Sequence, residues 1–571
     1  MTDSSFITLN ALSHEFKKGS QLALDNLNIT LNSSQMIGVV GPDGSGKTTL
    51  LRILAGLLKP THGSCHIDGV EVSADITIPE NLIRYMPQKF GLYEDLTVIE
   101  NLNLYADLNC LSYEEKKNQK ERLLKFTNLE SFQSRLAGDL SGGMKQKLGL
   151  ACSLLKKSKL LILDEPTVGV DPISRRELWQ MIDELLKSQI TIICSTSYLD
   201  EVEKFQTVLI MNEGKSIFQG TPESIKNNIL DRTFLLKDIK GSKRDILSDL
   251  LITQSVADGI IQGDDIRILA KKNQESACKN ELAKVGTVYP TASNFEDAYL
   301  DFIPDPPQRK SPIYDLYPTF SKDLSASIIA TNLSKSFGNF IAVDDISFSV
   351  KQGEIFGLLG PNGAGKSTTF KMLCGLLKPS KGQSSIKSIS LLDAPSQARA
   401  KIGYMAQKFS LYSNMTVLQN LNFFYGIYPA YNQKNHAVEE MIETFFLQPF
   451  LNSLTKDLPL GFKQRLALAC AIMHRPEVLF LDEPTSGVDP ITRREFWSHI
   501  NALVSKNVAI IVTTHFMDEA EYCDRIGLVN CGKLVALGTP DEIKGLAKSD
   551  IHPNPSLEEA FIHISSKGLS A

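Results

Sequence analysis

The sequence has no long apolar run, no secretory signal and no strong net charge. Its 571 residues are 42% hydrophobic and 22% charged, and no apolar stretch approaches the roughly 18 residues that a membrane-spanning helix needs. The N-terminus, MTDSSFITLN, lacks the basic stretch and the apolar core of a secretory signal. We therefore expect a chain without a membrane span, with the cytoplasm as its default compartment.

Paired cysteines and a basic charge balance are also missing. The nine cysteines are scattered, with no CxxC pair and mostly apolar neighbours, which favours buried reduced thiols over disulfides or a zinc site. The formal net charge is −5, so there is no global basic field for binding nucleic acid. At roughly 150 residues per domain, the length predicts about four structural units.

What the sequence does contain is an internal duplication. The segment GPDGSGKTTL recurs as GPNGAGKSTT, so that Lys366 follows Lys47 by 319 residues (366 minus 47). Later in each copy, Asp482 follows Asp164 by 318 residues (482 minus 164), a slip of one residue. The predicted organisation is a first copy at 1–231, a small accessory region at 232–303, a linker at 304–327, a second copy at 328–545 and a C-terminal tail at 546–571.

Each copy predicts an α/β fold. Short apolar runs rich in β-branched residues, such as MIGVV and TIICST, alternate with helical patterns such as ISRRELWQMIDELLKS. Runs that are apolar on both faces are typical of a mostly parallel sheet buried under helices. We expect a mostly helical insert between Gln88 and Ser141 and between Gln407 and Leu458. The accessory region predicts a small α+β appendage, and the Pro- and Ser-rich linker is expected to be semi-extended.

Each copy has a glycine-rich loop of the form GxxxxGK[ST], directly after an apolar strand and before a helical run, as a P-loop requires. Glycines let the backbone curl around phosphate, whose oxygens bind the loop N–H groups and the helix N-terminus. Lys47 and Lys366 would reach the terminal phosphates, while Thr48 and Ser367 would hold Mg²⁺. A chance glycine-rich turn could explain one such match but not two in register. The predicted loop residues are Gly41, Gly44, Gly46, Lys47, Thr48 and Thr49 in the first copy and Gly360, Gly363, Gly365, Lys366, Ser367 and Thr368 in the second.

Two adjacent carboxylates end an apolar strand in each copy, in LLILDEP and VLFLDEP. The first, Asp164 or Asp482, is placed to support the Mg²⁺ shell. The second, Glu165 or Glu483, can polarise the attacking water as a general base. An acidic pair that merely caps a helix is the structural alternative. The repeated spacing from the loop lysine, 117 residues (164 minus 47) and 116 (482 minus 366), argues against it.

The segment LSGGMKQ, from Leu140 to Gln146, resembles the signature sequence of ATP-binding cassette (ABC) proteins. The resemblance covers both copies, as two tandem P-loop NTPase cassettes, and implies roles for further positions. Core packing is the alternative for the two phenylalanines among them. The implied nucleotide contacts are Ser141, Gly142, Gly143, Phe16 and Phe337, the implied contacts to Mg²⁺ and water are Gln88 and Gln407, and the implied residues at the seam of a cassette dimer are Asp171 and Asp489.

The two copies depart from the family pattern at different motifs. The switch histidine, which in the family contacts the γ-phosphate, is present as His515 in VTTHFMDEAE but is Ser197 in CSTSYLDEVE. Conversely, the second signature reads LPLGFKQ, with Pro459 and Leu460 in place of the serine and the first glycine. Proline has no N–H and leucine blocks close approach, so phosphate contact there should be weakened.

In the family, two cassettes pair head to tail, so that each ATP lies between the P-loop of one and the signature of the other. Such pairing would put both departures in one site, because Ser197 would face Pro459 and Leu460. We predict that this impaired site binds ATP and holds the dimer, and that it hydrolyses ATP slowly if at all; because Glu165 is retained, complete inactivity does not follow. Alternatively, the serine replaces the histidine without effect. The competent site would combine Lys366, Gln407, Asp482, Glu483 and His515 with Ser141, Gly142 and Gly143.

The linker, the similar ends of the two tails and the LPLGFKQ variant resemble the fused double-cassette subunits of bacterial multidrug exporters, which work with separate permeases of the second ABC permease class. The resemblance implies an ATPase that uses ATP and Mg²⁺ and powers export of drugs or other lipophilic compounds. It implies two permease partners, docked on the helical inserts at the cytoplasmic face of the inner membrane. Two alternatives stay open. Tandem-cassette translation factors have intact signatures and a long charged linker, and tandem-cassette importers usually have damage in the second cassette's catalytic residues.

Overall fold

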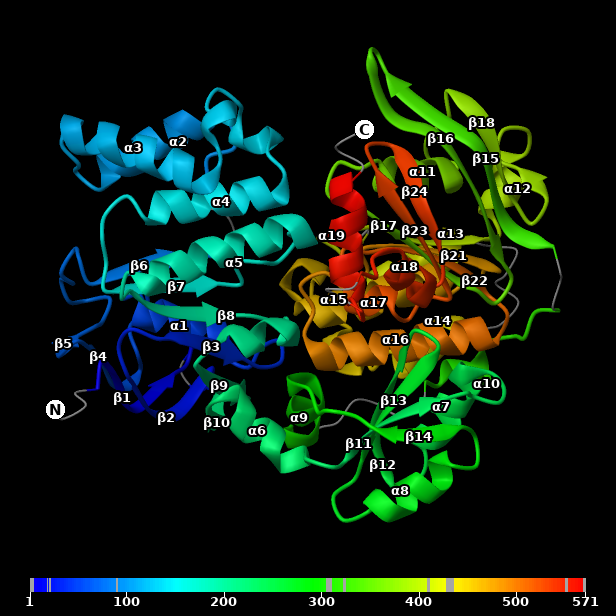
Figure 1. Cartoon of the computed structure of the whole chain (residues 1–571), viewed down its shortest axis with the longest axis horizontal. Helices are drawn as coiled ribbons and strands as arrows, with labels where there is room; N and C mark the ends of the chain where they lie inside the picture. The colour runs from blue at the N-terminus through cyan, green and yellow to red at the C-terminus, as the bar shows by residue number, and fades with distance from the viewer. Residues whose placement is uncertain are drawn as a thin grey trace. The chain divides into compact units, whose positions relative to one another are not determined.

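Each copy of the repeat folds into its own cassette. The computed structural model describes residues 5–17, 19, 22–88, 91–303, 311–321, 325–407, 411–427, 436–549 and 553–567. The chain forms two units, Met1–Asn228 with Asn294–Ile303, and Ile229–Ser293 with Pro304–Ala571. The first cassette, blue to cyan in Figure 1, therefore belongs to one unit, and the second, which ends in red, belongs to the other.

A six-stranded sheet forms the core of each cassette. Its strands are β3 (Met36–Val40), β6 (Ile83–Met86), β7 (Leu160–Asp164), β8 (Thr191–Ser195), β9 (Thr207–Asn212) and β10 (Lys215–Gly220) in the first cassette, and β17 (Ile355–Leu359), β20 (Ile402–Met405), β21 (Val478–Asp482), β22 (Ala509–Thr513), β23 (Arg525–Asn530) and β24 (Lys533–Gly538) in the second. Strands β3 and β17 are buried on both faces, as parallel strands under helices require.

The two core sheets have the same topology. The strand order is β6-β7-β8-β3-β9-β10 in the first cassette and β20-β21-β22-β17-β23-β24 in the second. Only the last pair, β9 with β10 or β23 with β24, is antiparallel. These sheets confirm the predicted α/β fold. They also bring the carboxyl ends of the parallel strands to one edge, where the motifs repeated in both copies place the candidate site.

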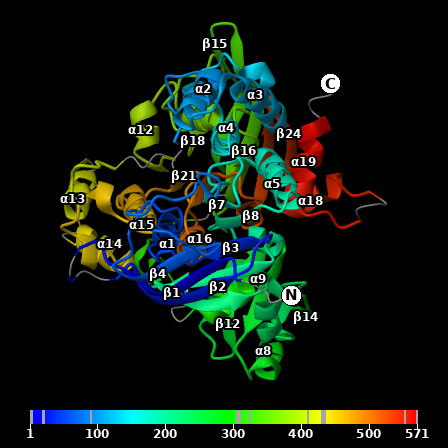
Figure 2. The same ribbon diagram turned by 90° about the vertical axis from the view of Figure 1, so that its left-hand side faces the viewer.

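A four-stranded antiparallel sheet packs beside the P-loop helix of each cassette. Helix α1 (Lys47–Leu54) shares one hydrophobic cluster with this sheet and the core sheet, in which Leu51 and Ile53 join Ile7 and Ile37; Figure 2 shows β1, β4 and α1 near one another. Helix α11 (Lys366–Leu373) has the matching place. The strands are β1 (Ile7–His14), β2 (Leu24–Leu31), β4 (His62–Ile67) and β5 (Val70–Glu71), and β15 (Ala326–Phe337), β16 (Phe340–Lys351), β18 (Lys381–Ile386) and β19 (Ile389–Ser390).

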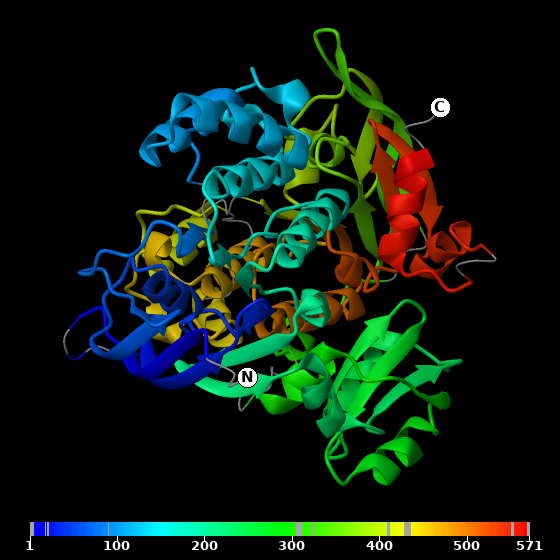
Figure 3. The same cartoon turned by 60° about the vertical axis from the view of Figure 1, so that its left-hand side comes forward.

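The insert of each cassette is mostly helical, as predicted. Thr97 and Ser112 start the first two helices with capping boxes, in which the hydroxyl and a glutamate satisfy free N–H groups. Figure 3 shows the first insert, in light blue, as a group of helices set apart from the dark blue strands. The insert helices are α2 (Val98–Leu108) and α3 (Tyr113–Thr127), and α13 (Val417–Ile427) and α14 (Ala437–Thr444); α4 (Gly142–Ser153) and α15 (Leu460–Ile472) follow directly after the inserts.

The accessory region forms a small α+β domain, as predicted. Its elements run in the order βαββαβ and its antiparallel strands lie in the order β12-β13-β11-β14, a ferredoxin-like arrangement. The domain belongs to the unit of the second cassette, whereas the next helix, α9 (Phe295–Phe302), belongs to the first unit and packs on α6 (Pro222–Lys226). The elements are β11 (Thr233–Lys237), α7 (Lys243–Leu251), β12 (Val256–Gln262), β13 (Asp265–Ala270), α8 (Glu275–Leu282) and β14 (Thr287–Pro290).

Part of the predicted linker packs on the second cassette. Helix α10 (Ile313–Leu316) lies against α16 (Pro490–Ser505), and the Tyr317 hydroxyl donates to the Pro476 carbonyl at 2.9 Å. Ile313 and Tyr317 are both buried because their spacing of four puts them on one face of a turn, a pairing that the polar composition hid. Residues 304–310 and 322–324 lie outside the described residues.

The remaining helices complete the two cassettes. They are α5 (Pro172–Lys187), α12 (Pro395–Arg399), α17 (Met517–Ala520), α18 (Pro540–Leu546) and α19 (Leu557–Lys567). Within the described ranges, no helix combines the length and the apolar character that crossing a membrane requires. The expected burial of the cysteines is confirmed for seven of them, whereas Cys110 and Cys531 are exposed.

Candidate functional site

The two P-loops have nearly identical backbone geometry. The φ values are 158°, 80° and 99° at Gly41, Gly44 and Gly46, and 159°, 82° and 103° at Gly360, Gly363 and Gly365. A Cβ on Gly46 would lie 2.5 Å from the carbonyl oxygen of Ala23, so this turn requires glycine. The turn delivers Lys47 and Lys366 to the first positions of α1 and α11, followed by the hydroxyls of Thr48, Thr49, Ser367 and Thr368.

The P-loop lysines fold back over their own loops. Lys47 Nζ donates to the carbonyls of Gly41 and Pro42 at 2.8 and 3.1 Å. Lys366 makes the matching pair of bonds at 2.6 and 3.0 Å. Both lysines are buried, and each ammonium lies beside the N-terminus of its helix. A cation next to free helix N–H groups fits a phosphate.

Asp164 and Asp482 end strands β7 and β21 beside the P-loop helices. Thr48 Oγ1 donates to Asp164 at 3.3 Å, so two predicted Mg²⁺ ligands of the first cassette are adjacent. The hydroxyls of Ser195 and Thr513 donate to the aspartates at 2.7 and 2.5 Å. Hydroxyl and carboxylate oxygens are ligands that Mg²⁺ prefers. The donor set therefore fits the ion.

Ser195 and Thr513 are functional residues that the sequence analysis missed. Each hydroxyl also accepts the backbone N–H of the glutamate that follows the aspartate: Ser195 accepts from Glu165 at 2.9 Å, and Thr513 accepts from Glu483 at 3.0 Å. Both glutamates have left-handed backbones, with φ values of 50° and 46°, which these bonds help to hold. The signal was present in CSTS and VTTH, where a hydroxyl stands two residues before the switch position in both copies.

In the first cassette, Glu165 is held by Ser197. The serine donates its N–H at 3.0 Å and its hydroxyl at 3.1 Å to the same oxygen, Oε2. Both side chains are buried. Burial raises the pKa of Glu165 above its usual range, and Lys47 and Ser197 offset only part of this effect. Gln88 is exposed and lies after β6, without a side-chain hydrogen bond to another described residue.

In the second cassette, Glu483 is brought together with both predicted partners. Gln407 Nε2 donates to Glu483 Oε2 at 2.7 Å, and His515 Nδ1 lies 3.4 Å from the same oxygen. Burial by itself raises the pKa of Glu483, but His515, Lys366 and Gln407 outweigh it and lower the pKa. His515 Nε2 is buried and has no hydrogen-bond partner among the described residues. That nitrogen is available to a ligand.

The two signature segments differ where their helices begin. Ser141 caps α4, and its hydroxyl accepts the N–H three residues on at 3.3 Å. Pro459 occupies the same position before α15 without a side-chain cap, and Leu460 replaces Gly142. A Cβ on Gly143 would lie 2.4 Å from a side-chain atom of α5, so that position requires glycine. The second helix start therefore lacks a backbone N–H at the cap position and has a bulky side chain at the next position.

The remaining predicted residues lie at loop and helix ends. Phe16 is 63% exposed and Phe337 is 51% exposed, which rules out the core-packing alternative and leaves ring surface for a stacking partner. Asp171 and Asp489 are the N-caps of α5 and α16. Each aspartate accepts hydrogen bonds from the first turn of its helix. Their place at a dimer seam stays a prediction.

Comparisons with known proteins agree with this geometry. The sequence profile of a family described as ABC transporter matches residues 24–168 and 343–486. A protein of Escherichia coli (strain K12) named Probable multidrug ABC transporter ATP-binding protein YbhF is 51% identical over 569 residues, which cover 98% of each chain. Linearmycin resistance ATP-binding protein LnrL of Bacillus subtilis (strain 168) is 36% identical over 218 residues, 38% of this chain and 70% of that one. Nod factor export ATP-binding protein I of Rhizobium leguminosarum bv. viciae is 39% identical over 219 residues, with the same coverage of 38% and 70%.

Proposed function

Because the chain belongs to the ABC transporter family of ATP-binding proteins, we propose that it powers a membrane exporter through one hydrolysing and one mainly ATP-binding site. The protein is an ATPase with two tandem cassettes. In this proposal, the competent site would use Lys366 and Glu483 together with the first signature at Ser141. The impaired site would use Lys47 together with the second signature.

The observation that carries this asymmetry is the difference in the partners of the two glutamates. Ser197 directs both its N–H and its hydroxyl at Glu165, so the one proton of that hydroxyl is already used. His515 faces Glu483 through Nδ1 and keeps a buried Nε2 without a partner among the described residues. A histidine with both ring nitrogens protonated has two N–H donors and can bridge the glutamate and a phosphate, whereas the serine as placed cannot. This supports the view that the serine does not replace the histidine.

ATP and Mg²⁺ fit the donor sets of both cassettes. When bound, Mg²⁺ would neutralise phosphate charge. It would be held by Thr48 and Asp164 with Gln88 in the first cassette, and by Ser367, Asp482 and Gln407 in the second. Charge-assisted contacts to phosphate would draw the cassettes together, and loss of the γ-phosphate would release them.

The helical inserts are the proposed docking surfaces for two permease subunits. Apolar side chains are exposed on both inserts, with Leu108 and Tyr113 at 65% and 81% in the first, and Phe423 and Ile427 at 37% and 49% in the second. Clustered exposed apolar side chains are typical of interaction sites. Through such partners the protein would work at the cytoplasmic face of the inner membrane.

The class of cargo and the direction of transport are proposed from the relatives. Their names refer to multidrug transport, linearmycin resistance and Nod factor export. From these names we propose that the cargo is a drug or another lipophilic compound and that it is exported. Copurification from detergent-solubilised membranes tests the assignment: permease partners are expected, and recovery of ribosomal proteins instead would favour a translation factor.

Paired substitution tests the division of labour. We expect Glu483→Gln to lower kcat for ATP hydrolysis by on the order of 100-fold or more, the range for losing a general base. Glu165→Gln should leave most of the activity. Equal losses would refute the asymmetry. Measured ATP binding by both variants is the control, since both should retain it.

A further inference from the structure

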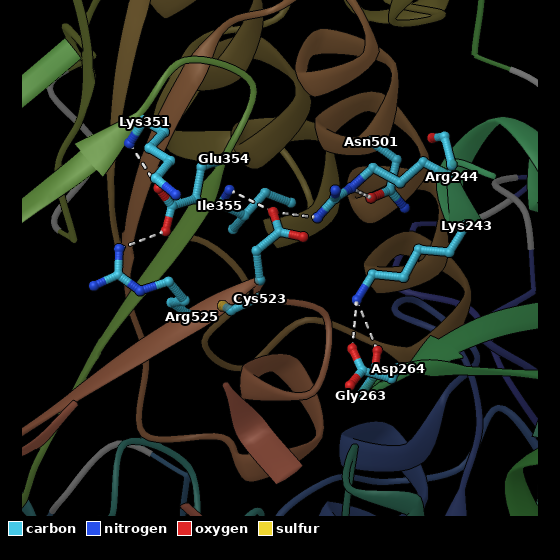
Figure 4. A network of polar contacts seen from close by, with 12 residues as sticks. Lys243, Arg244, Gly263, Asp264, Lys351, Glu354, Ile355, Asn501, Cys523 and Arg525 are labelled. Atoms are coloured by element: carbon cyan, nitrogen blue, oxygen red, sulfur yellow. Dashed lines mark hydrogen bonds and ion pairs between the residues drawn. The ribbon is translucent and has the colours of Figure 1, made fainter. Parts of the chain in front are cut away.

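The accessory domain, residues 229–293, packs on the second cassette through ion pairs whose arginines are buried. Arg244, at the start of α7, donates to Asp524 at 2.7 Å and to Asn501 of α16 at 3.2 Å, and its side chain is 9% exposed (Figure 4). Asp258 of β12 pairs with Arg494 of α16 at 3.2 Å. Since removing the aspartate of such a pair would leave a buried arginine charge behind, these contacts fix the geometry of the two surfaces.

The two surfaces do not pack against each other throughout. A cavity lies between α7, β12 and α16, lined by Arg244, Arg494, Trp497 and Tyr522 among others. The ion pairs therefore stand at the edge of a space instead of inside a continuous apolar core. Charged pairs with defined geometry specify how two surfaces are oriented, so this contact orients the accessory domain on the second cassette.

The partner of Arg244 is itself part of the P-loop strand assembly. Asp524 Oδ2 also accepts the backbone N–H of Ile355 at 2.9 Å, and Ile355 is the first residue of β17, which ends at the residue before Gly360. Next to it, Arg525 donates to Glu354 at 3.1 Å (Figure 4). A chain of polar contacts thus runs from the accessory domain to the strand that carries the P-loop.

The accessory domain also contacts the segment that follows the switch histidine. The N–H of Gly263 donates to the carbonyl of Glu521 at 3.2 Å, directly after α17, which begins two residues after His515. On α16, Ser505 donates to Asp245 at 3.1 Å. The domain therefore contacts α16 and the residue after α17 directly, and it reaches β17 through Asp524.

The first cassette has neutral residues at the matching positions. Gln206, at the place of Asp524 (524 minus 318), accepts the N–H of Met36 at 2.6 Å. Thr207 donates to Gln35 at 2.9 Å, where the second cassette has Arg525 and Glu354. A side chain accepts the N–H at the start of the P-loop strand in both cassettes. Only the second cassette, which has His515, offers a carboxylate there, Asp524, with which Arg244 can pair.

We propose that residues 229–293 are a positioning domain for the hydrolysing ATP site, with Arg244 as the positioning residue. This rests on the proposed function, in which the P-loop of the second cassette belongs to that site. Arg244 fixes Asp524, Asp524 fixes the start of β17, and the P-loop is thereby aligned with the switch segment. A displacement of about 1 Å, caused far from the reacting atoms, can cost up to about 100-fold in rate.

The experiment compares full-length variants in steady-state ATP hydrolysis. Arg244→Ala and Asp524→Gln, which copies the first cassette, should each lower kcat on the order of tenfold, with KM for ATP changing by less than about twofold. Arg244→Lys keeps the charge and should recover part of kcat. Gln206→Ala, the matched change in the first cassette, should leave kcat unchanged. Rates are expressed per folded chain, counted by bound ATP analogue and checked by thermal unfolding.

Two outcomes overturn the proposal. If Arg244→Ala lowers only the unfolding temperature while each folded chain keeps its kcat, the domain is a structural support alone. If Gln206→Ala lowers kcat as much as Arg244→Ala, the effect is not specific to the second cassette. Glu483→Gln, measured alongside, separates this from the proposed function. If Glu483→Gln abolishes ATP hydrolysis while Arg244→Ala keeps the parent kcat, only the positioning role is refuted. If Glu483→Gln keeps its activity, both the positioning role and the proposed function are refuted.

Discussion

The two cassettes share their strand order and the backbone of their P-loops, yet they differ in the side chains that hold the carboxylate of the glutamate beside them. The φ values at matched glycines agree within a few degrees, whereas Ser197 stands where His515 does, and Gln206 where Asp524 does. Apolar packing tolerates change if volume and pattern are kept, so the scaffold was easy to preserve in both copies. The comparison teaches that two candidate sites on the same scaffold can differ through a few side chains.

Exchanging the switch residue is expected to give the largest effect. His515→Ser gives the second cassette the arrangement of the first, with a hydroxyl turned toward Glu483. Losing one preorganised donor to a developing charge costs on the order of 100-fold in kcat. Steady-state ATPase rates at saturating ATP measure it, with Ser197→Thr as a control that should change little. A His515→Ser variant that keeps most of its kcat would show that the switch residue does not distinguish the activities of the two cassettes.

Rebuilding the impaired site is expected to give a smaller, opposite effect. In a Glu483→Gln background, any hydrolysis left comes from the site of Glu165. Adding Ser197→His, Pro459→Ser and Leu460→Gly should raise that residual rate by on the order of tenfold, since the general base is already present. Single-turnover hydrolysis of radiolabelled ATP is sensitive enough to measure it. An unchanged residual rate would show that the two motifs do not meet in one site.

Acid sensitivity is the smallest difference that we expect between the cassettes. His499, buried on α16 and bonded to Ser311 at 2.8 Å, has its pKa lowered to about 3 by burial and by Arg465. The matching residue of the first cassette is Met181 (499 minus 318). Because the folded pKa lies below the unfolded value of about 6.5, the unfolded chain takes up the proton first. His499 should therefore remove about 1 kcal/mol from the free energy of unfolding of the second cassette between pH 7.5 and 5.5.

Tryptophan fluorescence can report this loss for each cassette separately. The chain has two tryptophans, Trp179 in α5 and Trp497 in α16, and both are buried. Trp179→Phe leaves Trp497 as the probe for urea unfolding of the second cassette. His499→Met should then flatten the dependence of its unfolding free energy on pH. A slope unchanged by this substitution would assign the acid sensitivity to other groups.

The parts of the fold and site that could be read from the sequence are local. The P-loops, the acidic pairs and the asymmetry at Ser197 and His515 each lie in a short motif at the end of a strand. The contacts that sequence reasoning missed join distant residues: Arg244 and Asp524 are 280 residues apart, and no periodicity connects them. The short helix at Ile313 was also missed from the sequence, but for another reason. Its segment is mostly polar, and only two side chains, Ile313 and Tyr317, anchor it on the second cassette.

The division of the chain into units has one more consequence. The backbone passes between the two units three times, after residues 228, 293 and 303, so neither half can diffuse away when nucleotide leaves. Tethering of this kind replaces a bimolecular encounter by a high effective concentration. It also forbids exchange of halves between molecules, and the stoichiometry of one histidine-containing to one serine-containing cassette is therefore inherited with the polypeptide itself.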